Sequence, residues 1–210
     1  MQFLAQGPSN APRTLILAHG AGAPMDSDVM NDLAGRLATA GLRVLRFEFP
    51  YMAERRASGK KKPPDREPKL LDAWRTAVAA ARVDLPVGGR LALGGKSMGG
   101  RMASLIADEA GADALVCFGY PFHPPGKPDR LRTAHLETIR TPTLICQGER
   151  DPFGRRAEVE AYALSGAVEL FWAPDGDHDL KPRKASGLTH ADALDRVSAA
   201  AARWLENRLG

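Results

Sequence analysis

Cysteine is scarce in this sequence, and long apolar runs are missing from it. The 210 residues contain two cysteines, Cys117 and Cys146, each inside an apolar stretch, and their spacing matches no metal-binding motif. We therefore expect no disulfide framework and no metal site, with both thiols serving as small core residues. No apolar run approaches the roughly 18–20 residues that span a bilayer, so no membrane association is expected.

The first twelve residues lack the features of a secretory leader. Met1 to Pro12 contain neither a basic start nor a long apolar region. A cytoplasmic protein is therefore expected. No feature of the sequence indicates an oligomeric state.

Short apolar stretches alternate with segments of helical periodicity along the chain. The expected strands are Thr14–Ala18, Leu42–Phe49, Arg90–Leu93, Ala114–Phe118, Thr143–Gln147 and Val168–Trp172, with Phe3–Ala5 as an edge strand. The expected helices are Asp28–Ala40, Leu70–Val83, Met98–Ala110, Arg156–Leu164 and His190–Leu209. This alternation is typical of right-handed β-α-β units. We expect one α/β domain over 1–210, with a mostly parallel, doubly wound sheet of six or seven strands.

A serine lies between an expected strand and an expected helix. Gly95-Lys96-Ser97-Met98-Gly99 has the form Gly-x-Ser-x-Gly, in which a tight turn raises the serine hydroxyl above the sheet. Gly95 and Gly99 would let the strand and the helix approach each other. This context predicts that Ser97 is a catalytic nucleophile.

Two nucleotide-binding motifs are incomplete. Gly95-Lys96-Ser97 is similar to the end of a phosphate-binding loop, but Arg90 stands where that motif needs a glycine. Gly20 and Gly22 are similar to the start of a dinucleotide fingerprint, but Met25 occupies the third glycine position. No nucleotide cofactor is expected.

An acid and a base follow Ser97 in the chain order that serine hydrolases of α/β type use. Asp151 comes just after one expected strand and His178 just after the next. His178 would take the proton from Ser97, and Asp151 would orient its ring. Glu149 is the alternative acid, and His190, which opens a helix, is the competing base.

Backbone N–H donors are needed to stabilise a tetrahedral intermediate. One donor should be the N–H of Met98, the residue after the nucleophile. The second should come from the small residues after the first clear strand, with Ala21 expected and Gly22 close behind. His19 is expected to brace this loop.

The chain resembles the α/β-hydrolase superfamily over nearly its full length. It is similar above all to small predicted hydrolases related to testis-expressed protein 30, through the stretches His19–Met25, Arg46–Met52, Gly95–Arg101 and Gly176–Leu180. The resemblance implies an α/β-hydrolase fold without a large cap domain and a triad of Ser97, Asp151 and His178. This group also resembles a subunit of a chromatin-modifying complex, so an interaction module that retains the fold is the alternative function.

The expected function is cleavage of an ester-type bond in a small-molecule substrate through an acyl-enzyme intermediate. The order of serine, acid and histidine favours an enzyme, because a scaffold does not need these residues in order. The loop over 119–141 is too short to form a cap domain, so the site should be shallow. The sequence does not indicate whether the substrate is an ester, thioester, lactone or peptide.

The excess positive charge is confined to one segment. The chain has a net charge of +4, and residues 54–69 carry seven basic side chains against three acidic ones. Pro63, Pro64 and Pro68 predict an extended basic loop over 50–69, near the rim of the site. Two interpretations remain open: a solvated surface loop, or a partial lid that attracts anionic substrates. Nucleic-acid binding is disfavoured because the loop lacks interleaved aromatic side chains.

Overall fold

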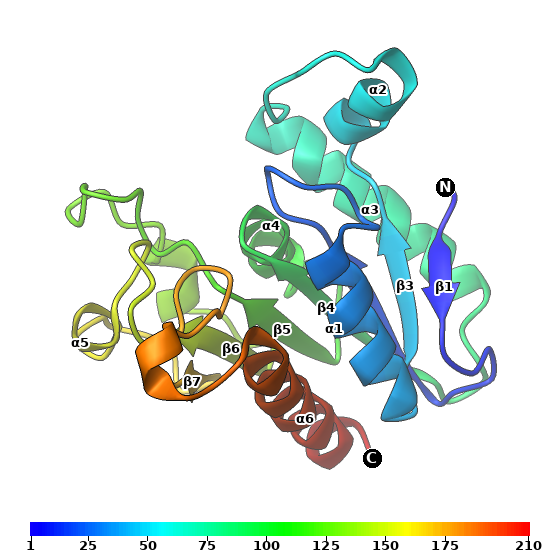
Figure 1. Ribbon diagram of the computed structural model, residues 1–210. Coiled ribbons are helices and arrows are strands. Elements are labelled where there is room, and N and C mark those ends of the chain that lie inside the picture. The colour runs from blue at the N-terminus through cyan, green and yellow to red at the C-terminus, as the bar shows by residue number, and fades with distance from the viewer.

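The computed structural model describes residues 1–210 and shows a seven-stranded sheet between two layers of helices (Figure 1). The strands are β1 (Leu4–Gln6), β2 (Arg13–Ala18), β3 (Arg43–Phe47), β4 (Arg90–Lys96), β5 (Ala114–Phe118), β6 (Thr143–Gly148) and β7 (Val168–Ala173). Their order in the sheet is β1-β3-β2-β4-β5-β6-β7, and β1 alone pairs antiparallel. The expected mostly parallel sheet of the α/β-hydrolase fold is confirmed.

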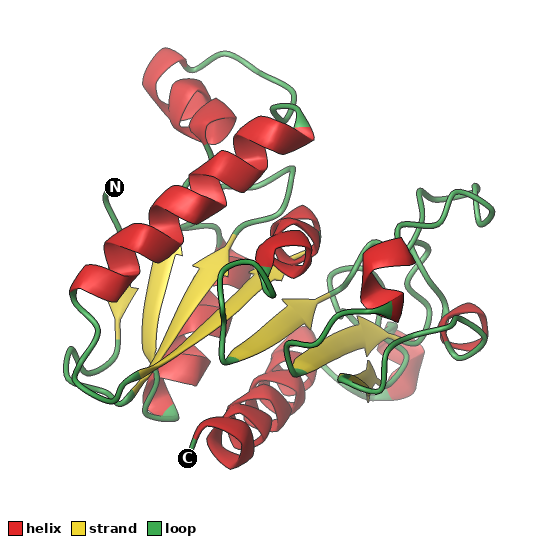
Figure 2. Ribbon diagram, turned by 180° about the vertical axis from the view of Figure 1, so that it is seen from behind, coloured by secondary structure: helices red, strands yellow, loops and turns green.

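Four long helices cover the two faces of the sheet, as Figures 1 and 2 show from opposite sides. Helices α1 and α6 pack together on one face, and α3 and α4 on the other. The helices are α1 (Asp28–Thr39), α2 (Pro50–Ser58), α3 (Glu67–Val83), α4 (Met98–Ile106), α5 (Arg156–Val159) and α6 (His190–Leu209), with 3-10 turns at Ala134–Glu137 and Lys184–Ser186. None of them combines the length and apolar character needed to cross a bilayer.

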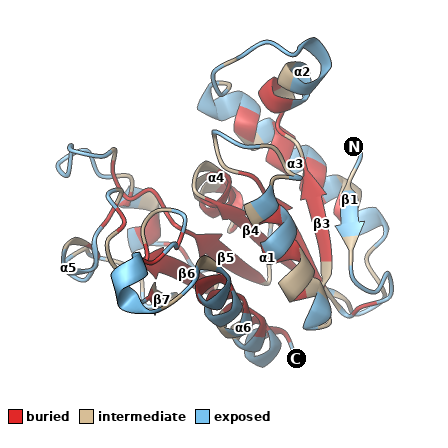
Figure 3. Cartoon of the chain, in the orientation of Figure 1, coloured by how far each residue is buried: buried red, intermediate tan, exposed pale blue.

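The sheet supplies both halves of the core. Along β2, Ile16 and Ala18 belong to the apolar cluster under α3 and α4, whereas Leu15 and Leu17 belong to the cluster under α1 and α6. Successive side chains of a strand point to opposite faces, so a strand covered on both sides must be apolar throughout. Figure 3 shows this as buried central strands between helices whose outer faces are exposed, while the edge strand β1 is itself exposed.

The prediction of one extended loop over 50–69 is wrong. Residues 50–58 form α2, and α3 begins at Glu67, which leaves only 59–66 as a connection. Pro50 occupies the first turn of α2, where the missing N–H has no intrahelical partner to lose. The next two side chains of α2 are buried, and Gly59 ends the helix with a left-handed φ of 67°.

Two helices end earlier than the periodicity predicted. Helix α4 stops at Ile106 and α5 spans only four residues, to Val159. After α5, Ala161 and Tyr162 donate to carbonyls three residues earlier, so the chain continues as turns. The β5–β6 connection contains only one 3-10 turn, so it forms no large cap.

Candidate active site

Ser97 lies on a sharp turn between β4 and α4. Its φ of 51° and ψ of −117° are rarely adopted by a residue with a side chain, and such strain accompanies functional turns. A Cβ on Gly95 would lie 2.5 Å from the backbone N of Gly100, and one on Gly99 would lie 2.6 Å from the carbonyl oxygen of Ala18. The two glycines therefore allow β4, α4 and β2 to meet closely enough to form the turn.

The structure brings Ser97, His178 and Asp151 into one hydrogen-bonded chain. Ser97 Oγ lies 2.8 Å from His178 Nε2, and His178 Nδ1 lies 2.8 Å from Asp151 Oδ2. Asp151 follows β6 and is fully buried, whereas His178 follows β7 and its side chain is 20% exposed. With the proton on Nδ1, the ring donates to Asp151 and accepts the serine hydroxyl.

The buried carboxylate of Asp151 has two further donors. Gln147 Nε2 lies 2.9 Å from Asp151 Oδ2, and the backbone N–H of Phe153 donates to Oδ1 over 2.8 Å. Gln147 also accepts from the N–H of Tyr120 at 2.7 Å, so its amide orientation is determined. A buried carboxylate needs such partners because burial otherwise penalises its charge. Sequence reasoning missed Gln147, although a polar residue at the end of an apolar strand was a readable signal.

Phe153 contacts the ring of His178, and Lys96 binds its backbone. The Phe153 ring lies 4.1 Å from the His178 ring, centroid to centroid, at an angle of 30°. Lys96 Nζ donates to the backbone carbonyl of His178 at 2.7 Å and pairs with Asp179 at 3.2 Å. Burial lowers the pKa of Lys96, and the Asp179 charge opposes that shift. Neither contact was predicted from the sequence.

The loop after β2 approaches Ser97 closely. A Cβ on Gly20 would lie 3.6 Å from Ser97 Cβ, and the N–H groups of Ala21 and Gly22 donate to no acceptor in the protein. The N–H of Met98 is the first of α4 and so has no intrahelical acceptor either. These donors are free for a substrate oxygen.

His19 braces this loop from behind. Its Nε2 accepts from the N–H of Phe49 at 3.1 Å, and its Nδ1 donates to the carbonyl of Gly20 at 2.7 Å. The pair of bonds requires a neutral ring, and burial lowers the pKa of His19 accordingly. Tyr51 of α2 adds a hydroxyl bond to the carbonyl of Ala21 at 3.0 Å.

The competing acid and base have other partners. Glu149 pairs with Arg156 at 3.0 Å and accepts from the N–H of Asp175 at 2.9 Å. His190 Nε2 lies 2.9 Å from the carbonyl oxygen of Asp179. Neither residue contacts the ring of His178.

Residues 11–206 match a family model described as alpha/beta hydrolase domain. The chain belongs to this family. No curated protein matches it.

Solved structures of several hydrolases share this fold at low sequence identity. A dienelactone hydrolase from Anabaena variabilis is 23% identical, with a TM-score of 0.74, and the match covers 98% of this chain and 91% of that one. A serine hydrolase without a lid from Xanthomonas campestris is 21% identical, with a TM-score of 0.71, over 95% and 87% of the two chains. The esterase domain of a Rhodothermus marinus protein is 17% identical, with a TM-score of 0.70, over 98% and 92%.

In this alpha/beta hydrolase chain, a hollow of about 570 Å³ opens at Ser97. It is lined by Gly20–Ala23, Ser27–Met30, Lys96, Ser97, Phe153, His178 and Asp179. The predicted donors Ala21 and Gly22 are therefore on its wall, whereas Met98 contributes only through its position next to Ser97. No residue of the basic segment 54–69 lines this hollow. No cluster of three or more His, Cys, Asp or Glu side chains is arranged to bind a metal.

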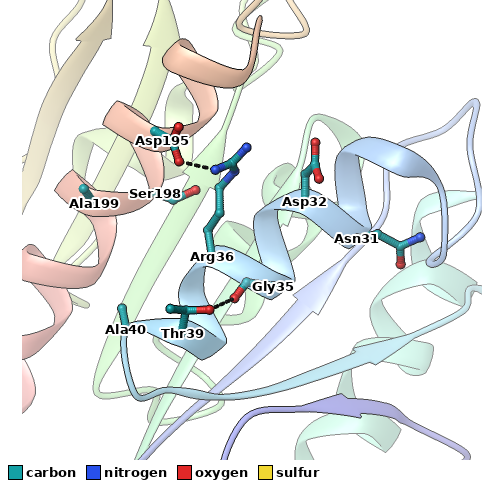
Figure 4. A pocket seen from close by; sticks show the side chains of 9 residues that line it. All are labelled: Asn31, Asp32, Gly35, Arg36, Thr39, Ala40, Asp195, Ser198 and Ala199. Carbon is teal, nitrogen blue, oxygen red and sulfur yellow. Dashed lines mark hydrogen bonds and ion pairs between the residues drawn. The ribbon is translucent and has the colours of Figure 1, made fainter.

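A second hollow of about 600 Å³ lies between α1 and α6, away from Ser97 (Figure 4). Its charged side chains include Arg36, which pairs with Asp195. It contains no histidine and no cysteine, and its one serine, Ser198, has no hydrogen-bond partner. We therefore place the candidate active site at Ser97.

Proposed function

We propose that this protein is a serine hydrolase that cleaves an ester-type bond through an acyl-enzyme intermediate. Ser97 is the nucleophile, His178 the general base and Asp151 the residue that orients the histidine. The observation that carries the proposal is the hydrogen-bonded chain from Ser97 Oγ through the His178 ring to the buried Asp151 carboxylate.

The first half of the reaction acylates Ser97. As Ser97 Oγ attacks the substrate carbonyl carbon, His178 Nε2 takes the hydroxyl proton. Asp151 stabilises the ring, which is then positively charged. The developing oxyanion accepts hydrogen bonds from the N–H of Met98 and from that of Ala21, with Gly22 as the alternative donor. Collapse of the intermediate expels the alcohol, which receives its proton from His178.

The second half of the reaction removes the acyl group and regenerates the free enzyme. His178 removes a proton from water, which attacks the acyl carbon, and the acid product leaves as the proton returns to Ser97 Oγ. The names of the structural relatives, an esterase domain and a dienelactone hydrolase, support an ester or lactone as the bond that is cleaved. The uncapped hollow supports a small substrate or an exposed ester group.

A fluorophosphonate probe tests the proposal directly, because it reacts covalently with an activated serine. We expect labelling of the wild-type protein, with peptide mapping of the adduct to Ser97. The Ser97→Ala variant should remain folded by circular dichroism and take up no label. Labelling at another serine would disprove the assignment, and a protein that neither labels nor cleaves any ester of a panel would favour the interaction module.

A further inference from the structure

A third, smaller hollow next to the Ser97 hollow is lined by four cationic side chains and by no carboxylate. We call it the basic groove; its volume is about 270 Å³, and it is lined by Pro24, Met52, Arg55, Arg56, Gly59, Lys60 and Lys61. Arg56 forms ion pairs with Asp26 and Glu48. Arg55, Lys60 and Lys61 form no ion pair and no side-chain hydrogen bond. Three unneutralised positive charges therefore face one small volume.

The other two lysines of the basic segment are paired with carboxylates, whereas Arg66 is exposed and unpaired but does not line the groove. Lys62 pairs with Glu54, and Lys69 pairs with Asp65 at 2.9 Å. Arg55 is partly buried and has no anionic partner. Placing like charges together costs energy that a bound anion would offset.

The basic groove adjoins the Ser97 hollow. Ala23 lines the Ser97 hollow and Pro24, the next residue, lines the basic groove. The wall between them is thus the loop that carries the free N–H groups of Ala21 and Gly22. A molecule bound across this loop can reach both hollows.

Two contacts join α2, whose side chains line part of the basic groove, to the loop that lines the Ser97 hollow. Tyr51 donates its hydroxyl to the carbonyl of Ala21 at 3.0 Å, and Arg56 lies 2.7 Å from Asp26 at the end of the loop. Burial raises the pKa of Tyr51 to about 12, while the nearby Arg55 charge acts in the opposite direction.

We propose that the basic groove binds an anionic group of the substrate, a phosphate or a carboxylate, while the reacting carbonyl lies at Ser97. The inference rests on the proposed hydrolase function and names its substrate class, an ester-type molecule with a negative charge beyond the scissile bond. The groove contributes binding and orientation only, and no bond forms or breaks there.

The test compares two esters that differ in one charge: 4-nitrophenyl butyrate and the mono-4-nitrophenyl ester of glutaric acid. The variant Lys60→Gln/Lys61→Gln removes two charges from the groove. The matched control, Lys127→Gln/Arg203→Gln, removes two exposed cations that form no ion pair and line none of these hollows. We expect the groove variant to raise KM for the acidic ester about fivefold with kcat unchanged, since exposed charges act weakly. KM for the neutral ester should not change.

Two further measurements identify the source of the effect. In 0.5 M salt the difference between wild type and groove variant should shrink, because salt screens exposed charges. Inorganic phosphate should compete with the acidic ester and not with the neutral one. Equal KM changes for both esters, the same change in the control variant, or no change would overturn the proposal. A loss of DNA or acidic-vesicle binding in the groove variant, without a KM effect, would also overturn it.

The outcome for the groove is separable from the outcome for the proposed function. Turnover of the neutral ester that depends on Ser97, with no preference for the acidic ester, would leave the hydrolase proposal standing and reject the groove. Calorimetric binding of the acidic ester to the Ser97→Ala protein provides a readout that needs no turnover. Weaker binding after the groove substitutions is expected there, and unchanged binding would reject the groove even if no ester is cleaved.

Discussion

Lys96 and His178, far apart in the sequence, are joined by a hydrogen bond of 2.7 Å from the lysine ammonium to the histidine carbonyl oxygen. Lys96 directly precedes Ser97, so the turn that positions the Ser97 hydroxyl also holds the backbone of His178, the proposed general base. Lys96 is 7% exposed, and its charge is balanced by Asp179. The distance between Ser97 Oγ and the His178 ring thus depends on the hydrogen bond that Lys96 donates to the His178 carbonyl oxygen.

Replacing Lys96 should therefore damage kcat more than KM. Lys96→Met keeps the length of the side chain but removes the bond to the His178 carbonyl. We expect kcat to fall by about a hundredfold, because a displacement on the order of 1 Å costs this much, while KM stays within about twofold. The control is Lys181→Met, which changes an exposed lysine that lies in the loop of His178 and forms no ion pair. A change confined to KM would show that Lys96 binds substrate instead of positioning His178.

The proposed acid and base can be separated from their competitors by substitution. His178→Ala should abolish turnover, and Asp151→Asn should lower kcat about ten-thousandfold, since the orienting carboxylate is lost. His190→Ala and Glu149→Gln should retain most of the activity, because neither side chain contacts the His178 ring. Steady-state kinetics with one ester distinguishes the Asp151 and His178 assignment from the Glu149 and His190 alternative. An inactive His190→Ala or Glu149→Gln protein that still folds would move the assignment to that residue.

Gln147 should matter for stability as well as activity. Its amide is buried and bonds to Asp151 and to both backbone groups of Tyr120. Gln147→Leu leaves the buried N–H of Tyr120 without an acceptor and removes one donor each from the Tyr120 carbonyl and the Asp151 carboxylate. An unsatisfied buried group costs about 1–3 kcal/mol. We expect a loss of free energy of unfolding in this range or above it, measured by urea denaturation. An exposed substitution, Gln2→Leu, provides the control, and an equally small effect of both changes would contradict the buried network.

His19 should make the protein less stable in mild acid. Burial lowers its pKa below the usual 6.5, so the unfolded chain binds this proton more readily than the folded one. The stabilising contribution of neutral His19 is therefore full above pH 6.5 and is lost progressively as the pH falls below it. His19→Gln, which does not titrate, should show a smaller stability difference between pH 7.5 and pH 5.5. An NMR titration of the wild type should give His19 a pKa below that of an unfolded reference peptide; an equal or higher pKa in the folded protein would refute the prediction.

Much of the fold was readable from local patterns. A strand covered on both faces has to be apolar throughout, and such runs at β2, β5 and β6 stand out from the helical periodicity around them. Gly95 and Gly99 around a serine, between a strand and a helix, indicate the turn because only glycine allows the backbones to approach so closely. The sequence by itself thus determined the fold class and the loops in which to look for Ser97, Asp151 and His178.

Only the tertiary structure decided which side chains surround these three. Lys96, Gln147 and Phe153 reach the site through contacts between loops that are distant in sequence, and no local periodicity encodes them. The same holds for the basic segment: its prolines indicate a loop, but burial of Tyr51 and Met52 stabilises α2 and turns Arg55, Lys60 and Lys61 toward one groove. The physical reason is that propensity acts between neighbours in the chain, whereas packing and charge act between neighbours in space.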